Sequence, residues 1–229
     1  MPSTYISLCN QVLRRLNEVE ISDADFSSVR GVHALSKDAV KASLARINQA
    51  EFGWPFNAAT HTQTLVAGTE EYSWPANLKT ADFNSFQILE DANLGSKNAT
   101  MASMDRDEYY RYHRDTDTTS GAAGRGVPTH IYPAHGSAFG VTPTPDKAYK
   151  VKFNYFLNYT DLTLYDDVTR VPTSFDSVLV DGALYHMYMF KDNVESAQAS
   201  YVAFEQGLKD LQSLYINQFD YIRDTRVRF

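Results

Sequence analysis

The chain has 229 residues, enough for one large domain or two small ones with a buried core. Its net charge of −7 argues against a protein that grips nucleic acid, because such surfaces are normally basic, although an acidic wall would let DNA slide past. The single cysteine, Cys9, cannot form an internal disulfide. Neither a signal peptide nor a membrane-spanning segment is expected, so the protein is expected to be soluble and intracellular at synthesis.

Two helices are predicted near the N-terminus. Apolar residues recur at steps of three and four over residues 4–17, which is typical of an amphipathic helix. The polar segment 23–32 indicates a loop. A second helix is predicted over 36–51, with Ser36 as its N-cap. Residues 53–56, which contain a glycine and a proline, then end it.

The middle of the chain has the character of β-structure. Extended segments are predicted at residues 60–66, 72–75 and 83–89. A short helix is expected over 105–112, with Met104 and Tyr109 facing inward. Residues 115–127 are polar and rich in glycine, so a loop is expected there.

The clearest strand is predicted over residues 151–159. Alternation with a period of two places one set of side chains on a single face: Val151, Phe153, Tyr155, Leu157 and Tyr159. The proline-containing turn 142–146 precedes this strand. We therefore expect a hairpin in which 130–132 and 138–141 pair with it.

Two further helices are predicted near the C-terminus. The first runs from 173 to about 191. The second, 194–215, has apolar residues at alternating steps of three and four: Val194, Ala197, Tyr201, Phe204, Leu208, Leu211 and Tyr215. Three heptads are too few for a free coiled coil, so a helical hairpin packed on the N-terminal helices is expected.

These elements predict an α+β fold. Residues 1–56 and 172–217 are expected to form an antiparallel helix bundle from both ends of the chain. Residues 57–171 would form an inserted domain with an antiparallel, barrel-like β-sheet. Residues 218–229 would extend as a C-terminal tail.

The sequence contains no recognisable catalytic, cofactor or metal motif. The pair His130 and His135 lacks the spacing of a zinc site, and Cys9 lies in an apolar helical pattern where a thiolate is disfavoured. The glycines of 121–126 lack the Lys-Ser/Thr of a phosphate-binding loop. We therefore expect no enzyme activity, no cofactor and no metal.

Five short motifs follow one another along the chain. The first is an N-terminal helix pair with a polar loop between its helices. The other four lie at residues 47–57, 72–83, 127–149 and 171–184. In this order they resemble the tail tubular protein A and head-to-tail adaptor family of tailed bacteriophages, although the motif at 72–83 carries Trp74 where the family usually has leucine.

The resemblance implies a virion structural protein without catalytic residues. Relatives form a ring, twelvefold in symmetry, between the portal and the tail nozzle or tail tube. The implied partners are further copies of the chain, the portal, the tail protein and the genomic DNA, which passes through the lumen without sequence-specific binding. The implied location is the head–tail junction of the virion, after assembly in the host cytoplasm, with no membrane partner.

Two groups of residues are candidates for contacts in such an assembly. The basic tail is a candidate for docking on an acidic portal surface, through Arg223, Arg226, Arg228 and Phe229. A tail without order is the alternative. Large aromatic side chains are candidates for contacts between subunits: Trp54, Trp74, Tyr155 and Tyr201.

Three other functions compete with the adaptor hypothesis. A neck or head-completion protein would act at another level of the virion. An accessory carbohydrate-binding module could stack sugars on Trp54 and Trp74, but such modules are usually all-β. An enzyme with an unrecognised motif is the third alternative.

Overall fold

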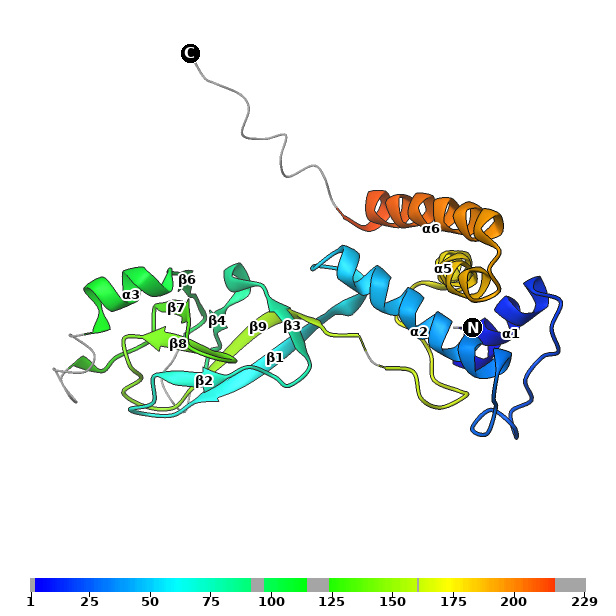
Figure 1. Ribbon diagram of the computed structural model, residues 1–229. Helices are drawn as coiled ribbons and strands as arrows, with labels where there is room; N and C mark the ends of the chain where they lie inside the picture. Colours follow the sequence, from blue (N-terminus) through cyan, green and yellow to red (C-terminus); the bar gives the residue numbers. More distant parts are fainter. Residues whose placement is uncertain (1–2, 92–96, 115–123, 160, 217–229) are drawn as a thin grey trace, which may run out of the picture. The chain divides into compact units, whose positions relative to one another are not determined.

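The computed structural model describes residues 3–91, 97–114, 124–159 and 161–216. The chain divides into two compact units (Figure 1). One consists of Met1–Asn57 together with Asn158–Phe229 and is helical, and the other is Ala58–Leu157 and contains the strands. The predicted α+β class is confirmed. The tail predicted at 218–229 lies outside the described residues.

The helical unit contains four long helices in its described part: α1 Tyr5–Arg15, α2 Val32–Ala50, α5 Asp176–Phe190 and α6 Val194–Tyr215. Thr4 caps α1, because its hydroxyl accepts a hydrogen bond from the backbone N–H of Ser7. The cap predicted for α2 is wrong. The helix begins four residues earlier, after Gly31, and the Ser36 hydroxyl is buried and donates to the carbonyl of His33.

Helix α5 is the centre of the helical unit, packed against α1, α2 and α6. Two glycines allow close approach of its neighbours. An added Cβ at Gly182 would lie 2.3 Å from the Ser43 hydroxyl oxygen on α2, and one at Gly207 on α6 would lie 2.6 Å from Val178. The predicted hairpin of α5 and α6 is confirmed, and α6 buries Phe204, Leu208 and Leu211 of its predicted apolar stripe.

Residues 158–171 belong to the helical unit, although they were predicted to lie in the domain that contains the strands. The backbone N–H groups of Tyr5 and Ile6 donate to the carbonyls of Asp167 and Tyr165, at 2.7 and 3.1 Å. Leu162 is buried in the core of the helices. The segment lacks helical periodicity, so only these tertiary contacts reveal where it packs.

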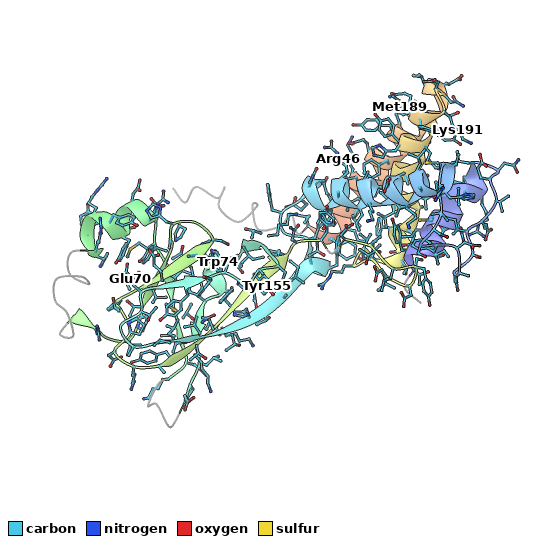
Figure 2. The ribbon with its side chains drawn as sticks, turned by 60° about the horizontal axis from the view of Figure 1, so that its bottom comes forward. Arg46, Glu70, Trp74, Tyr155, Met189 and Lys191 are labelled. Carbon is cyan, nitrogen blue, oxygen red and sulfur yellow. The ribbon has the colours of Figure 1, made fainter. Side chains whose placement is uncertain are left out.

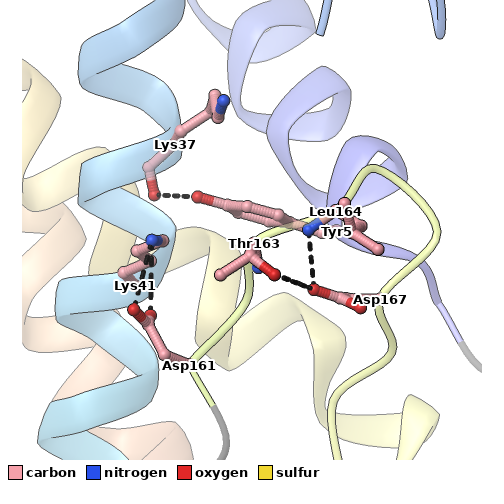
Figure 3. A network of polar contacts seen from close by, with 7 residues as sticks. All are labelled: Tyr5, Lys37, Lys41, Asp161, Thr163, Leu164 and Asp167. Carbon is pink, nitrogen blue, oxygen red and sulfur yellow. Dashed lines mark hydrogen bonds and ion pairs between the residues drawn. The ribbon is translucent and has the colours of Figure 1, made fainter. Parts of the chain in front are cut away.

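A network of polar contacts stabilises this loop (Figure 3). The backbone N–H groups of Thr163 and Leu164 donate to the Asp167 carboxylate at 2.6 and 2.7 Å, and they hold the pKa of that carboxyl below its usual value. Lys41 of α2 forms an ion pair with Asp161 at 3.3 Å. The loop is therefore fixed both within itself and to α2.

The described strands of the second unit form two sheets and no closed barrel. The first sheet contains β1 Ala58–Leu65, β3 Leu78–Ala81, β4 Gln87–Ile88, β5 Ala99–Thr100 and β9 Tyr149–Leu157. The second contains β2 Glu71–Ser73, β6 Ala102–Ser103, β7 His130–Pro133 and β8 Ala138–Thr142. The pairing is antiparallel except for the parallel pair of β6 and β7.

An aromatic core lies in this unit, with side chains from both sheets. Strand β9 shows the predicted alternation, with every second residue buried from Tyr149 to Leu157. Its Phe153 stacks on Phe86 with ring centroids 4.4 Å apart, and Phe139 of β8 contacts both rings. The short helix α3, Arg106–Tyr112, follows the buried Met104 and itself buries Tyr109, as predicted.

Two predictions for the strands are wrong. Strand β7 pairs with β8, but β8 does not pair with β9, which lies in the other sheet. The turn after Thr142 leads the chain from one sheet to the other, and the backbone N–H of Gly68 donates to the carbonyl of Pro145 within it. Residues 83–89 form the short 3-10 helix η2, Phe83–Ser85, before the two-residue β4, because the Asp82 side chain accepts a bond from the N–H of Asn84 and caps a turn there.

Candidate functional site

Two of the four aromatic residues proposed for subunit contacts are buried inside the subunit. Trp54 is fully buried in the helical unit, where its indole N–H donates to the carbonyl of Ile47 at 2.8 Å. Tyr155 is buried in the β unit, and its hydroxyl donates to the side chain of Asn77. These side chains stabilise the cores, and their burial leaves them little surface to offer another subunit.

The other two aromatic residues are partly exposed. Trp74 lies at the margin of the aromatic core of the β unit, with its ring 4.6 Å from that of Phe139 (Figure 2). Tyr201 projects from α6 beside Tyr185 of α5, with ring centroids 5.3 Å apart. Tyr201 therefore keeps an accessible ring on a surface of the helical unit.

Tyr201 lines a groove of about 460 Å³ between α2, α5 and α6. Helix α2 contributes small and polar side chains, and α5 and α6 contribute rings. The main lining residues are Ala42, Ala45, Arg46, Tyr185, His186 and Tyr201. Small residues on one wall and rings on the other make a surface that a partner's apolar side chain can fill.

One buried hydroxyl in the lining of the groove has no hydrogen-bond partner among the described residues. It belongs to Ser43 and lies between α2 and Gly182 of α5. At the groove's edge, partial burial lowers the pKa of His186. The lining of the groove is thus mostly uncharged, and Arg46 contributes a positive charge to it.

Exposed apolar side chains gather at the turn between α5 and α6. Met189, Phe190 and Val194 are all exposed there, in the part of the helical unit where Figure 2 labels Met189 and Lys191. Lys191 forms an ion pair with Glu18 at 2.7 Å, which brings the exposed Val19 to the same end of the helices.

A carboxylate in the β unit joins α3 to the second sheet. Glu70 accepts hydrogen bonds from the hydroxyls of Tyr109 and Tyr132, whose rings stack 3.9 Å apart. Burial raises the pKa of Tyr132, so its hydroxyl stays protonated and donates. The group holds α3 in place and requires no catalytic role.

The histidine pair considered for a metal is not brought together. The ring of His130 lies near that of His113, and the ring of His135 lies near Tyr110. Within the described ranges there is no group of three or more metal-ligating side chains. In the same ranges, the helices are too short or too polar to cross a bilayer.

The basic tail residues Arg223, Arg226, Arg228 and Phe229 lie outside the described residues. Most of the residues that line the groove were not predicted from the sequence. Arg46, Tyr185 and His186 lie on two helices distant in sequence, and only their packing brings them to one surface. The one available signal was the glycine at 182 within an apolar helix, which indicates a close helix–helix contact.

No curated protein matches the chain. A family model described as SU10 adaptor protein matches residues 3–228, nearly the whole chain. The chain therefore belongs to the SU10 adaptor protein family, a family of phage adaptor proteins.

Proposed function

We propose that the protein is a head-to-tail adaptor that forms a ring under the portal of a tailed phage and has no enzymatic role. The match of the adaptor family over residues 3–228 carries this proposal. The resemblance to the tail tubular protein A group gives the ring, twelvefold in relatives, and its place between the portal and the tail nozzle or tube. Membership of that group is itself part of the proposal.

The charge of the chain supports a channel through which DNA slides. The net charge is −7, so a lumen formed by many copies repels phosphate rather than trapping it. DNA would then move through the lumen without sequence-specific binding. The subunit reaches its place at the head–tail junction after assembly in the host cytoplasm.

A closed ring requires two different surfaces that fit each other on neighbouring copies. The groove that contains Tyr201 is our candidate for one of them, because it is partly apolar and accessible. Changing Tyr201 to Ser should weaken self-association at least tenfold, whereas Val202→Ser, at an exposed position beside it on α6, should not. Analytical ultracentrifugation measures the difference, and equal association of both variants would contradict this role.

The basic tail is our candidate for portal docking. Arg223, Arg226 and Arg228 can pair with carboxylates of the portal, and Phe229 adds an apolar contact. Native mass spectrometry of the chain, alone and with the portal, tests the proposed function directly. A ring on the portal is expected, and a chain that ignores the portal would overturn the proposal. Removal of residues 218–229 should abolish portal binding and leave the circular dichroism unchanged; unchanged binding would rule out docking by the tail.

A further inference from the structure

One edge of the first sheet has no partner among the described residues. Strand β1 pairs with β9 along its whole length, in an unbroken register from Ala58 opposite Phe156 to Leu65 opposite Tyr149. On the other side of β1, no strand pairs with it, and no backbone–backbone hydrogen bond outside the sheet reaches it, within the described ranges. Apart from the Thr64 carbonyl, which accepts a bond from the Gln63 side chain at 3.0 Å, the backbone donors and acceptors of this edge are therefore available among the described residues.

This edge lacks the features that normally prevent strand addition. Proteins protect an exposed edge with lysine, proline, a bulge or a very short strand. Strand β1 has eight residues, carries no charged side chain and no proline, and pairs without a bulge. A long, regular and unprotected edge is a site for another strand.

The two faces of β1 differ. His61 is half-buried and contacts the rings of Phe153 and Tyr155, at the margin of the aromatic core. The opposite face is exposed: Thr62 pairs with Lys152 and Thr64 pairs with Lys150 across to β9. An added strand should place apolar side chains on the first face and acidic ones on the second.

The C-terminal segment of the chain follows this pattern at four of six positions. The chain leaves α6 at Ile216 in an extended conformation, with φ −91° and ψ 114°. In the sequence that follows, one alternate set is Phe219, Tyr221 and Arg223, and the other is Asp220, Ile222 and Asp224. In an extended strand, the two rings would share one face and the two carboxylates the other.

We propose that residues 217–224 of one copy add as a strand to β1 of a neighbouring copy. The neighbouring copy follows from the ring of the proposed function, because a free strand and an open edge are two different, complementary surfaces. Eight residues match the length of β1. Strand addition would place Arg223 at the sheet and leave Arg226, Arg228 and Phe229 for the portal. Phe219 and Tyr221 extend the core beside His61. Asp220 and Asp224 lie on the same face as Lys152 and Lys150, of which Lys150 also forms an ion pair with Asp91 at 3.4 Å.

Disulfide trapping tests this pairing in the full-length chain. The natural Cys9 is buried, and burial raises the pKa of its thiol to about 12, so it gives little background. A chain with Thr62→Cys is mixed with a second chain, distinguished by a size tag, that carries Ile222→Cys or Asp220→Cys. Directly opposite residues of paired strands lie within disulfide distance, and the two cysteine positions test two registers that keep the same face toward Thr62. The matched control is Tyr221→Cys, which would project to the other face.

The expected result is a mixed dimer whose yield with Ile222→Cys or Asp220→Cys is at least fivefold that with Tyr221→Cys. Equal yields at the three positions, or no mixed dimer at the highest protein concentration and in the portal-bound ring, would overturn the proposal. So would a bond that forms only within one chain when Thr62→Cys and Ile222→Cys are combined.

A truncation separates this proposal from the proposed function. Removal of 217–229 should abolish self-association, whereas removal of 226–229 should abolish only portal binding. A ring that forms on the portal without the mixed disulfide would contradict strand addition and leave the adaptor function standing. A mixed disulfide in a chain that does not bind the portal would support strand addition and contradict the adaptor function.

Discussion

Gly140 shows how a single residue can decide the packing of the β unit. A Cβ at this position would lie 2.0 Å from the ring of Tyr132. The ring cannot move aside, because it stacks on Tyr109 and its hydroxyl is bound by Glu70. We predict that Gly140→Ala lowers the free energy of unfolding by about 2 kcal/mol or more. Urea denaturation checks this, and Gly126→Ala, whose Cβ would meet only Pro143 at 4.0 Å, should have a much smaller effect.

The hydrogen bonds to the Asp167 carboxylate make the stability of the protein depend on pH. The pKa of this carboxyl is held below the ordinary value of 3.8 by the N–H groups of Thr163 and Leu164, so the folded state favours the carboxylate. The stabilisation is present above the unfolded pKa and is lost as the pH falls through the folded pKa. Asp167→Asn should therefore lower the urea midpoint at pH 7, and the difference from wild type should shrink as the pH falls below about 4.

The neighbouring carboxylate provides the control for this prediction. Asp166 is exposed on the same loop, and Asp166→Asn should leave both the urea midpoint and its pH dependence close to those of wild type. Equal losses in the two variants at pH 7 would show that the loop responds to charge in general and not to the hydrogen bonds of Asp167.

At the scale of elements, helix α6 contains two leucines that differ greatly in burial. Leu208 is 6% exposed against the other helices, whereas Leu214, on the same helix, is 67% exposed. We predict that Leu208→Ala lowers the free energy of unfolding by about 2–4 kcal/mol, because it leaves a cavity, and that Leu214→Ala changes it by less than about 0.5 kcal/mol. Thermal and urea denaturation measure both changes. An equal loss of unfolding free energy in the two variants would contradict the described packing of α6.

Helices were predicted better than strand partners, for a physical reason. The apolar stripe of α6 and the alternation of β9 are local patterns, and each was read correctly from neighbouring residues. The pairing of β8 with β2 and β7 instead of β9 depends on where the chain turns after Thr142, which no local pattern specifies. Strand β3 and the short β5 and β6 carry too few residues for any period to be visible.

At the scale of the whole molecule, the β unit is one continuous stretch of chain with its own core. Its two ends are close, because Ala58 pairs with Phe156 across β1 and β9. We predict that residues 58–157 fold in isolation, and that the helical unit folds when a short Gly/Ser linker replaces them. Dispersed NMR spectra would support independent folding, and a collapsed spectrum of either fragment would contradict it.

The sequence by itself determined the α+β class, the main helices, the strand at β9 and the resemblance to phage adaptors, because these depend on local periodicity and on the order of motifs. It did not determine which aromatic side chains reach the surface. Trp54 and Tyr201 look equally suited to an interface in the sequence, yet a core encloses the first and a groove exposes the second. Burial, the groove and the open edge of β1 arise from contacts between segments far apart along the chain, so only the tertiary structure decided them.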